Sequence, residues 1–560
     1  MKKNFVRLRW FFTMLLFVTT MIMPSMMLAQ SITPTTPKGK GTAEEPYQIS
    51  TAAELYWFAG LVNGTLPDGG GKDASANAIL TDNITVNEGV LDAVNKGQVS
   101  ESDFIEWKPI GTYDSYDAVY TGTFDGQGHT ISGLYFNHPN ASYVGLFGYI
   151  GANGKISNVG VSDSYFQFRM KGGGVCGKND KDGVLQNCSN SSTVIGKNQY
   201  SRTGGVCGDN SGTVRDCKNT GSVSGENFVG GVCGINLGTI KSCYNTGSVH
   251  GTDICVGGVC GNCFRVTDTN YCYYLSDTAT RGIGNLMADE KDKAEKMFKE
   301  QFESGEVAWL LNGKGSGEQV WGQQLGKDLY PVPGSAYKVI KAAQGDKDAN
   351  GHYTYWATFS NLKNDVTLSV PSGRNLNVYN ATVSGGKMTL TERNNQVAKE
   401  EGVLLKTDGE YVNAKANEAN ELTKASSYEN HLVATPAEAK TVTAAAGCKL
   451  YRLTYNDAIH KDRLGFYLGS SDGNSLKATP GKAYLKVSEN EAKAPSSVAL
   501  TRSFVFGGGS ETTGIDEITI MGTDVQRHGT IEGIFDLQGR KISNPTKGIY
   551  IKNNKKVIIK

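Results

Sequence analysis

The chain has 560 residues, of which 70 are glycine and only 14 are proline, and its formal net charge at pH 7 is +1. This composition favours an ordered, β-rich protein of several domains over a disordered linker. A near-neutral charge gives no electrostatic reason to expect nucleic acid as a partner. The seven histidines are scattered from His129 to His528 without a pair at helical spacing, so they predict no metal site.

Residues 1–29 have the pattern of a secretory signal peptide. Four basic residues precede an apolar stretch from Trp10 to Met23, and Pro24 and the small residue Ala29 follow it. Cleavage is expected after Ala29 or Gln30, since the apolar stretch is too short to span a bilayer. It would remove four positive charges and take the net charge from +1 to −3. No cysteine follows the stretch, which argues against a lipoprotein anchor, and no later segment is apolar enough for a transmembrane span.

A leader at residues 30–50 precedes the first predicted helix. Thr51 and Glu54 form a capping-box pattern, in which each side chain satisfies a free backbone N–H group at the helix start. One face of this helix carries four apolar side chains: Leu55, Phe58, Ala59 and Val62. Such a helix is suited to covering the open first rung of a stacked β-structure.

Short apolar runs in residues 79–143 predict the first coils of such a stack, and one pattern then recurs five times within residues 144–275. Its equivalent positions are Phe147, Cys176, Cys207, Cys233 and Cys260, which lie 29, 31, 26 and 27 residues apart. A period of this size is typical of stacked supersecondary units. Each copy predicts three brief strands, which gain a full hydrogen-bond ladder when they stack about 4.8 Å apart.

Glycine and asparagine separate these predicted strands. Glycine is expected at corners with positive φ, because it adopts that conformation without a steric cost. Asn190, Asn219 and Asn245 occupy equivalent positions and are expected to bond their own backbone and to stack on one another. A parallel β-helix satisfies all of these requirements.

Ten of the 11 cysteines lie between residues 176 and 272. A second series follows the first by 10 or 12 residues: Cys188, Cys217, Cys243 and Cys272. Stacking holds Cβ atoms at about the rung spacing, which is wider than the roughly 3.5–4.5 Å of a disulfide, so two apolar thiol ladders in the lumen are favoured. Some disulfide bridges, or metal or redox chemistry, are the alternatives. The repeat is broken at Cys255 and Cys263, where Cys260 and Cys263 form a CxxC motif.

The pattern GGVCGxNxGTIxxCxNTGSVxG resembles the GLUG motif of bacterial surface proteins, with Val and Cys where many copies have Leu and Val. Gly39–Asn63 and Tyr120–Asn137 resemble the entry segment of the same proteins, and the segment from Glu306 to Pro333 resembles the stretch that closes their β-helices, so the resemblance extends to about residue 335. It implies a right-handed β-helix of the filamentous-haemagglutinin and adhesin kind. It implies no particular ligand.

The remaining domains follow this β-helix. Residues 288–302 are charged and helical in composition, and an aromatic segment with Trp321 and Tyr330 follows, which predicts a C-terminal cap for a β-helix domain over residues 51–335. Short alternating strands in residues 336–508 predict an antiparallel β-sandwich-like region or a pair of small β-domains. The predicted fold class is therefore all-β: a parallel β-helix with small helical caps, a sandwich-like region and a small C-terminal β-domain.

Residues 509–560 contain DLQGR at 536–540 and KGIYI at 547–551. This pattern resembles the C-terminal sorting domain of the type IX secretion system. The resemblance implies that the tail directs the protein across an outer membrane. A small structural β-domain is the alternative.

Two motifs in the sandwich-like region are incomplete. Ser471 occupies the nucleophile position of a GxSxG motif, but it links two β-segments and not a strand to a helix, so a turn is predicted. Asp346, Asp348 and Asn350 copy the first half of a calcium loop, but Ala357 stands where a bidentate glutamate is needed. A solvated turn is expected there, with weak calcium binding as the alternative.

Polysaccharide lyases and hydrolases also use β-helices, and they need paired carboxylates, or a carboxylate with Arg or Lys, on adjacent coils. The polar candidates are Asp125, His129, Asp163, Asp209, Asp216 and Glu226. They do not share one phase of the repeat, apart from Asp216 beside the cysteine series. We therefore predict no catalytic, cofactor-binding or metal-binding residues.

The leading hypothesis is a non-catalytic binding protein, either secreted or on the outer surface of a Gram-negative bacterium. It would act as an adhesin or recognition scaffold for host or matrix glycans or proteins, since a solenoid presents repeated side chains for multivalent contact. Its other partners would be the secretion and surface-attachment machinery. A β-helix polysaccharide lyase or glycoside hydrolase, and a structural component of the cell envelope, are the alternatives, because fold alone does not decide function.

Overall fold

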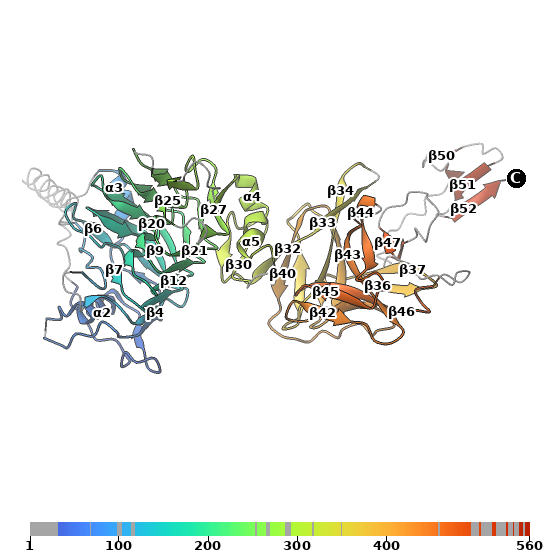
Figure 1. Ribbon diagram of the computed structural model, residues 1–560, viewed down its shortest axis with the longest axis horizontal. Coiled ribbons are helices and arrows are strands. Elements are labelled where there is room, and N and C mark those ends of the chain that lie inside the picture. Colours follow the sequence, from blue (N-terminus) through green and yellow to red (C-terminus); the bar gives the residue numbers. More distant parts are fainter. Residues whose placement is uncertain are drawn as a thin grey trace, which may run out of the picture. The chain divides into compact units, whose positions relative to one another are not determined.

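A computed structural model describes most of the chain between residues 32 and 505 (Figure 1). The described ranges are 32–67, 69–97, 103–113, 118–252, 255–264, 269–285, 293–315, 319–348, 350–456, 460–493 and 503–505, and strands are assigned at 518–521, 534–535, 541–542, 548–552 and 555–559. The predicted signal peptide lies outside the described residues. The chain divides into two compact units, of which the first comprises the residues up to Ala342 together with Leu368–Arg374 and Gly409–Ala416.

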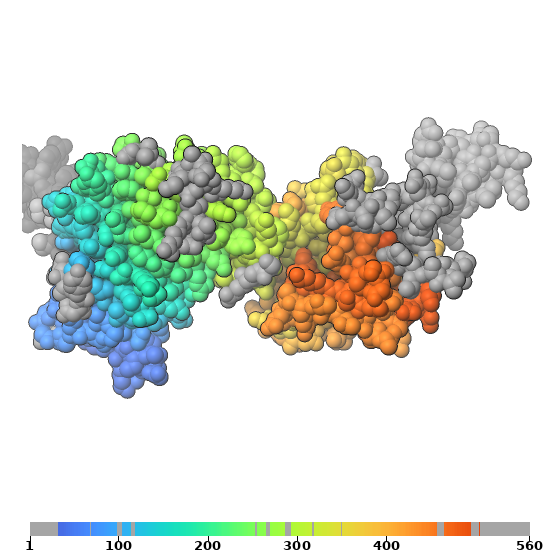
Figure 2. Space-filling model, in the orientation of Figure 1, coloured from blue at the N-terminus to red at the C-terminus, as the bar shows by residue number. Residues whose placement is uncertain are grey.

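The first unit contains a parallel β-solenoid of about seven turns, which confirms the predicted β-helix. Each coil lies against the one before it, so the colour of this unit changes in order from blue to green (Figure 2). Its strands form four sheets, here named A to D. Sheet A consists of β1 (Tyr47–Ile49), β2 (Ala78–Leu80), β4 (Thr123–Asp125), β8 (Lys155–Ser157), β12 (Val184–Gln186), β16 (Thr213–Arg215), β21 (Thr239–Lys241) and β26 (Thr269–Asn270).

In the other three sheets, too, neighbouring strands come from successive coils of the solenoid. Sheet B consists of β3 (Ile84–Thr85), β5 (Thr130–Ser132), β6 (Tyr135–Asn137), β9 (Gly160–Phe168), β13 (Ser189–Gly196), β17 (Lys218–Asn219), β18 (Val223–Ser224), β22 (Tyr244–Asn245), β23 (Val249–His250), β27 (Cys272–Leu275) and β29 (Ala294–Met297). Sheet C consists of β7 (Phe147–Ile150), β11 (Cys176–Asn179), β15 (Cys207–Asn210), β20 (Cys233–Asn236), β25 (Cys260–Cys263) and β28 (Ile283–Asn285). Sheet D consists of β10 (Lys171–Gly173), β14 (Arg202–Gly204), β19 (Val229–Gly230) and β24 (Val256–Gly257).

The number of strands per coil differs from the prediction of three. The coil that begins with β10 continues through β11, β12 and β13 before β14 starts the next one. Sheet D is the additional sheet, and it ends at the paired glycines of the GGVCG pattern. These short strands were missed because two of the four, β19 and β24, are only two residues long.

Positive φ angles at one corner of the repeats belong to residues other than glycine. Between sheets A and B, Asn158, Asn187, Asp216, Ser242 and Tyr271 have φ between 52° and 56°. The expectation of glycine at positive-φ corners is therefore wrong here.

The repeat glycines instead permit close packing of neighbouring backbone. A Cβ atom on Gly205 would lie 2.2 Å from the carbonyl oxygen of Gly231 and 2.3 Å from Cγ of Asn219. Such distances are far inside van der Waals contact. The second glycine of GGVCG is therefore the partner of the buried asparagine that lies beside it.

Two asparagine ladders run along the solenoid, of which only the one with Asn190, Asn219 and Asn245 was predicted. The Asn190 amide donates to Asn219 Oδ1 at 2.8 Å, and the Asn219 amide donates to Asn245 Oδ1 at 2.7 Å. Asn219 Oδ1 also accepts from the backbone N–H of Gly221 at 3.2 Å, which is the predicted bond to its own turn. A second ladder joins Asn179, Asn210 and Asn236 at 2.8 and 2.7 Å.

The cysteine series form two columns in register, which confirms the predicted thiol ladders. Cys176 pairs with Cys207, Cys207 with Cys233, and Cys233 with Cys260. In the second column, the backbone N–H of Cys188 donates to Cys217 Sγ and that of Cys217 to Cys243 Sγ, both at 3.4 Å. All eleven cysteines are free thiols, and the ten in the solenoid are buried.

Helix α2 (Ala52–Asn63) covers the first coils as predicted, and a second helix, α3 (Val90–Asn95), was not predicted. Helix α2 begins with the Thr51 and Glu54 capping box and buries Leu55, Phe58 and Val62 in the solenoid core. The short helix α3 lies beside β9, where the Leu91 N–H donates to Asp163 Oδ1 at 2.9 Å.

The C-terminal cap differs in part from the prediction. Residues 294–297 of the predicted helix form β29, which extends sheet B by pairing Cys272 with Ala294 and Leu275 with Met297. Helices α4 (Lys299–Glu303) and α5 (Glu306–Leu311) follow, then β30 (Trp321–Gly322) and β31 (Val332–Pro333). Their side chains pack on Tyr244 and Tyr273, which lie on sheet B.

The first unit ends with an antiparallel strand pair. Strand β32 (Tyr337–Lys341) pairs with β40 (Tyr411–Ala416), which returns from about seventy residues further along the chain. Asn413 of β40 joins the cap, because its amide donates to the Gln323 carbonyl at 2.7 Å and its Oδ1 accepts from the Leu325 N–H at 2.8 Å.

The second unit contains two antiparallel sheets that share one core, as predicted. One consists of β33 (Ala343–Lys347), β34 (Tyr353–Ser360), β39 (Gly402–Thr407), β36 (Leu376–Ser384) and β37 (Lys387–Arg393), with β48 (Ile518–Met521) parallel to β37. The other consists of β41 (Leu432–Ala434), β46 (Ala483–Ser488), β43 (Cys448–Asn456), β44 (His460–Leu468) and β47 (Ser503–Val505). One small pair, β42 (Lys440–Thr443) with β45 (Ser475–Ala478), accompanies them. Strands β35 (Val366–Ser369) and β38 (Gln396–Val397) pair with each other and belong to the four-stranded sheet of order β32-β40-β35-β38.

The tail forms a small antiparallel sheet. Its strands are β50 (Lys541–Ile542), β49 (Ile534–Phe535), β51 (Gly548–Lys552) and β52 (Lys555–Ile559), in that order. Residues 536–540, which carry the DLQGR motif, lie outside the described residues, so the resemblance to a sorting domain stays a prediction. Within the described part of the chain, no helix is both long and apolar enough to cross a membrane.

Candidate functional site

The carboxylates that a β-helix carbohydrase would need are used for local hydrogen bonds or stand apart. Asp125 Oδ1 accepts from the Gln127 N–H at 2.9 Å and from the Asn158 amide at 2.8 Å. Asp163 accepts from helix α3, and Glu226 is exposed in the turn after β18. His129 lies in the turn before β5. These four residues therefore form no convergent acid and base pair.

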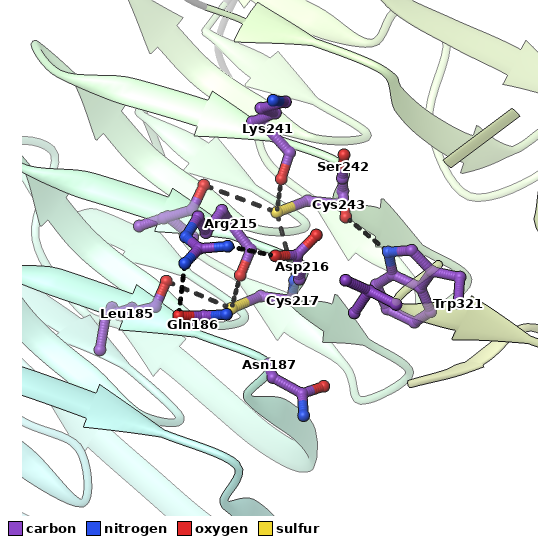
Figure 3. A network of polar contacts seen from close by, with 12 residues as sticks. Leu185, Gln186, Asn187, Arg215, Asp216, Cys217, Lys241, Ser242, Cys243 and Trp321 are labelled. Carbon is purple, nitrogen blue, oxygen red and sulfur yellow. Dashed lines mark hydrogen bonds and ion pairs between the residues drawn. The ribbon is translucent and has the colours of Figure 1, made fainter. Parts of the chain in front are cut away.

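Asp216 belongs to a polar network at the corner between sheets A and B (Figure 3). Its carboxylate pairs with the Arg215 guanidinium at 3.0 Å, and the same guanidinium donates to Gln186 Oε1 at 2.6 Å. Behind them, the Cys217 thiol donates to the Arg215 carbonyl at 3.1 Å. Because the charge of Asp216 is paired and its neighbours are thiols and carbonyls, the network stabilises the corner.

The CxxC motif does not form a separate thiol site. Cys260 continues the first cysteine column, whereas Cys263 pairs with Asn236 and so takes the next position of an asparagine ladder. Cys263 Sγ lies 3.5 Å from the Thr269 hydroxyl oxygen. Cys255 is buried and directly precedes β24. No group of three or more His, Cys, Asp or Glu residues suited to a metal ion occurs among the described residues.

The two incomplete motifs of the second unit lie in turns. Ser471 is exposed in the segment between β44 and β45, next to Asp472, which accepts from the Ser470 hydroxyl at 2.6 Å. Asp348 accepts from the backbone N–H groups of Asn350 and His352 at 2.8 and 3.0 Å, in the turn between β33 and β34. These bonds to its own turn lower the pKa of Asp348, the His352 N–H contributing most.

Buried carboxylates of the second unit also bind backbone. Asp365 accepts from the N–H groups of Lys399 and Leu422, both at 2.7 Å. Glu401 is paired with Arg393 and accepts from the Ala425 N–H at 3.0 Å. Both acids therefore fix the segment that follows β40.

Asp209 has a different environment from the other candidates. It is 2 % exposed, and its Oδ2 pairs with Lys171 at 2.9 Å and with Arg202. Lys171 and Arg202 face each other in register on sheet D, where two like charges would otherwise repel. The buried carboxylate holds them together but compensates only one of the two positive charges. Its Oδ1 is buried without a hydrogen-bond partner in the described part of the chain.

Two further cations lie beside this pair, at the junction of sheets B and D. Strand β9 pairs with β13 through Phe168 and Gly196, so the next residues, Arg169 and Lys197, follow on adjacent rungs. Both are exposed, and neither forms an ion pair with any described residue. We name Arg169, Lys171, Lys197 and Arg202, with the exposed Tyr200, the basic corner.

The flanks of the basic corner are defined by polar and aromatic side chains. Tyr149 donates from its hydroxyl to Asp180 at 2.8 Å and accepts from Lys178 at 2.9 Å. Burial, together with the bond to Asp180, raises the pKa of Tyr149, so it stays protonated. Lys171 Nζ lies 5.2 Å from the ring centre of Tyr143. Glu226 follows Lys197 on the next coil and closes the corner with a negative charge.

Sequence reasoning did not identify the basic corner. None of its members was among the candidates, although the neighbouring Asp209 and Glu226 were. Lys171 and Arg202 both lie five residues before the cysteine that begins the sheet C strand, Cys176 and Cys207. An alignment of the repeat copies at that outward position would have shown the two cations on consecutive rungs.

Comparisons with known proteins give two partial similarities. Over 176 residues the chain is 30% identical to halomucin of Haloquadratum walsbyi, which covers 31% of this chain and 2% of halomucin. Over 127 residues it is 32% identical to a protein of Evansella cellulosilytica named as a Gly-rich membrane protein, covering 23% of this chain and 12% of that protein. The chain thus spans a small part of either relative. No protein-family model and no solved structure matches it.

Proposed function

We propose that this chain is a surface-displayed or secreted binding protein that acts without catalysis, as an adhesin or a recognition scaffold for glycans or matrix proteins. One similar protein is named as a Gly-rich membrane protein and the other as halomucin, and these names support a surface location. The predicted signal peptide and sorting-type tail would bring the chain there.

The observation that carries the proposal is the contrast between the inside and the outside of the solenoid. Inside, buried thiol and asparagine columns fill the core. Outside, cations occupy adjacent rungs, as Lys171 with Arg202 and Arg169 with Lys197 do, and the rung spacing of about 4.8 Å suits multivalent contact with a polymer. Of the six candidate polar residues, only Asp209 is a buried carboxylate beside two cations.

The test is a paired screen of the chain from residue 31 onward. It is expected to bind members of a glycan and matrix-protein array and to release no reducing ends or unsaturated sugars from the same glycans. Release of product that is lost in Asp209→Asn, but retained in a variant of the exposed Lys155, would establish the enzymatic alternative. Recovery only in insoluble envelope assemblies, with no soluble ligand, would favour the structural role.

A further inference from the structure

We infer that the basic corner binds an anionic polysaccharide, one whose sugar units carry carboxylate or sulfate groups. This inference rests on the proposed function and deepens it by naming the ligand class and the binding surface. It starts from the four cations of the corner, which lie in two columns on adjacent rungs.

The first column is preorganised. Lys171 and Arg202 are held in register by one buried carboxylate, and they are only 15% and 32% exposed in their side chains. Their ammonium and guanidinium groups are therefore fixed before a ligand arrives, which lowers the entropic cost of binding. A guanidinium is also the group best suited to pairing with carboxylate or sulfate oxygens.

The second column supplies unpaired charge. Arg169 and Lys197 are exposed and form no ion pair with the described residues, so an anion can reach them without breaking an existing contact. Tyr200 lies between Lys197 and Arg202 in sequence and is 62% exposed. Its ring offers an apolar surface and a hydroxyl group, a combination suited to contact with a sugar.

Polysaccharide fits this surface better than other polyanions. A protein that binds nucleic acid carries a basic stripe and a basic pI, whereas this sequence has a pI of about 7.5. An anionic bilayer is bound by a run of basic residues with apolar groups that insert, and the corner has four cations and one exposed ring. A short cationic patch with an aromatic neighbour suits a few charged sugars along a chain.

The test measures equilibrium binding of the full chain to matched pairs of polymers. Dextran sulfate is compared with dextran, and polygalacturonate with its methyl ester, at low and high ionic strength. We expect binding to the charged member of each pair only, with an affinity that falls as salt screens the charges. Tighter binding of dextran sulfate would indicate that the corner prefers sulfate, and tighter binding of polygalacturonate that it prefers carboxylate.

Variants then locate the site. Arg169→Gln combined with Lys197→Gln is expected to weaken binding about tenfold, which corresponds to about 1.4 kcal/mol. Lys155→Gln combined with Lys241→Gln removes the same charge from exposed positions of sheet A and should change the affinity less than about twofold. Glu226→Gln should strengthen binding, because it removes a negative charge that follows Lys197 on the adjoining coil and opposes the ligand.

Several results would overturn the inference. Equal weakening by the sheet A control would show a non-specific charge effect. Equal competition by duplex DNA or by phosphatidylserine vesicles at matched charge would show that sugars are not preferred. Binding of neutral glycans alone would refute the basic corner and leave the proposed function intact, whereas release of sugar products would refute the proposed function itself.

Discussion

Asn190, Asn219 and Asn245 each use the whole side-chain amide. Asn219 accepts from Asn190 and from Gly221, and it donates to Asn245 and to the Gly221 carbonyl at 3.0 Å. A buried amide costs free energy unless its donors and acceptors are satisfied. The ladder meets this requirement by passing one bond from rung to rung, which also fixes the register of neighbouring coils.

Replacing Asn219 with alanine should therefore destabilise the solenoid by roughly 2–4 kcal/mol. The change removes both bonds to the neighbouring asparagines and leaves the backbone of its own turn without its partners. Urea unfolding followed by circular dichroism measures the effect as a lower midpoint.

The matched control is Asn140→Ala, since Asn140 is exposed in the turn after β6. Its midpoint should stay close to that of the unmodified chain. If both variants unfold at the same urea concentration, the asparagine ladder does not contribute to stability in the way described.

At the residue level, the sequence predicted the function of these asparagines but not that of the glycines. Asparagine at a repeated position has few alternatives to backbone bonding, so its function follows from its type. The effect of Gly205 depends on atoms of Gly231 and Asn219, which only the stacked structure brings close. The positive-φ corner is filled by Asn, Asp, Ser and Tyr, so no single residue type marked it.

The thiol columns, like the asparagine ladders, repeat one side chain on every rung. A thiol, however, can be buried without a strong hydrogen-bond partner. Most of these buried thiols donate a weak bond to a carbonyl two residues away, as Cys243 does to Lys241 at 3.2 Å. Burial raises the pKa of the Cys176, Cys233 and Cys260 thiols well above the usual value. Because the thiolate is the reactive form, these cysteines should be inert in the folded chain.

Alkylation tests this expectation. At about pH 8, the ten solenoid thiols should react much more slowly with iodoacetamide than Cys448, because all ten are buried away from the reagent whereas Cys448 is half-buried in the second unit. All 11 should react in urea, as peptide mass spectrometry would record. A Cys448→Ser variant should lose the fast phase.

Two results would contradict the expectation of unreactive, reduced thiols. Rung-to-rung disulfides in the non-reduced protein would show that the columns oxidise on export. Rapid native labelling of Cys176 or Cys233 would contradict the effect of burial on their pKa.

Elements were predictable where local pattern and stacking agree. Helix α2 was predicted because a capping box and an apolar face lie together in one short segment. Residues 294–297 are helical by composition, but they lie where one more rung can pair with β27, and the ladder of hydrogen bonds outweighs a weak helix propensity. The basic corner was missed for a similar reason, since its residues meet only through the coil register.

At the scale of the molecule, the compact units are not continuous stretches of the sequence. The sequence places a boundary near residue 335, where the aromatic cap ends. The first unit, however, includes β32 and also β40, which lies at residues 411–416, far beyond that boundary. Tyr411 of that strand packs with Ala308, Leu325 and Val339. A strand that returns over such a distance leaves no local signal in the sequence.

This topology predicts that Asn413→Ala weakens the first unit, although residue 413 lies far beyond the apparent boundary. The variant removes the bonds to Gln323 and Leu325 and leaves their backbone groups buried, at a cost of roughly 2–3 kcal/mol. Hydrogen exchange of β32 and of residues 321–325 should become faster, while exchange of β43 and β44 in the second unit should not change. Lys415→Ala is the control on the same strand, because that residue is exposed and contributes only a contact 5.6 Å from the Tyr337 ring. If exchange in the cap is unchanged by Asn413→Ala, β40 does not support the first unit, and the boundary near residue 335 is the energetic one.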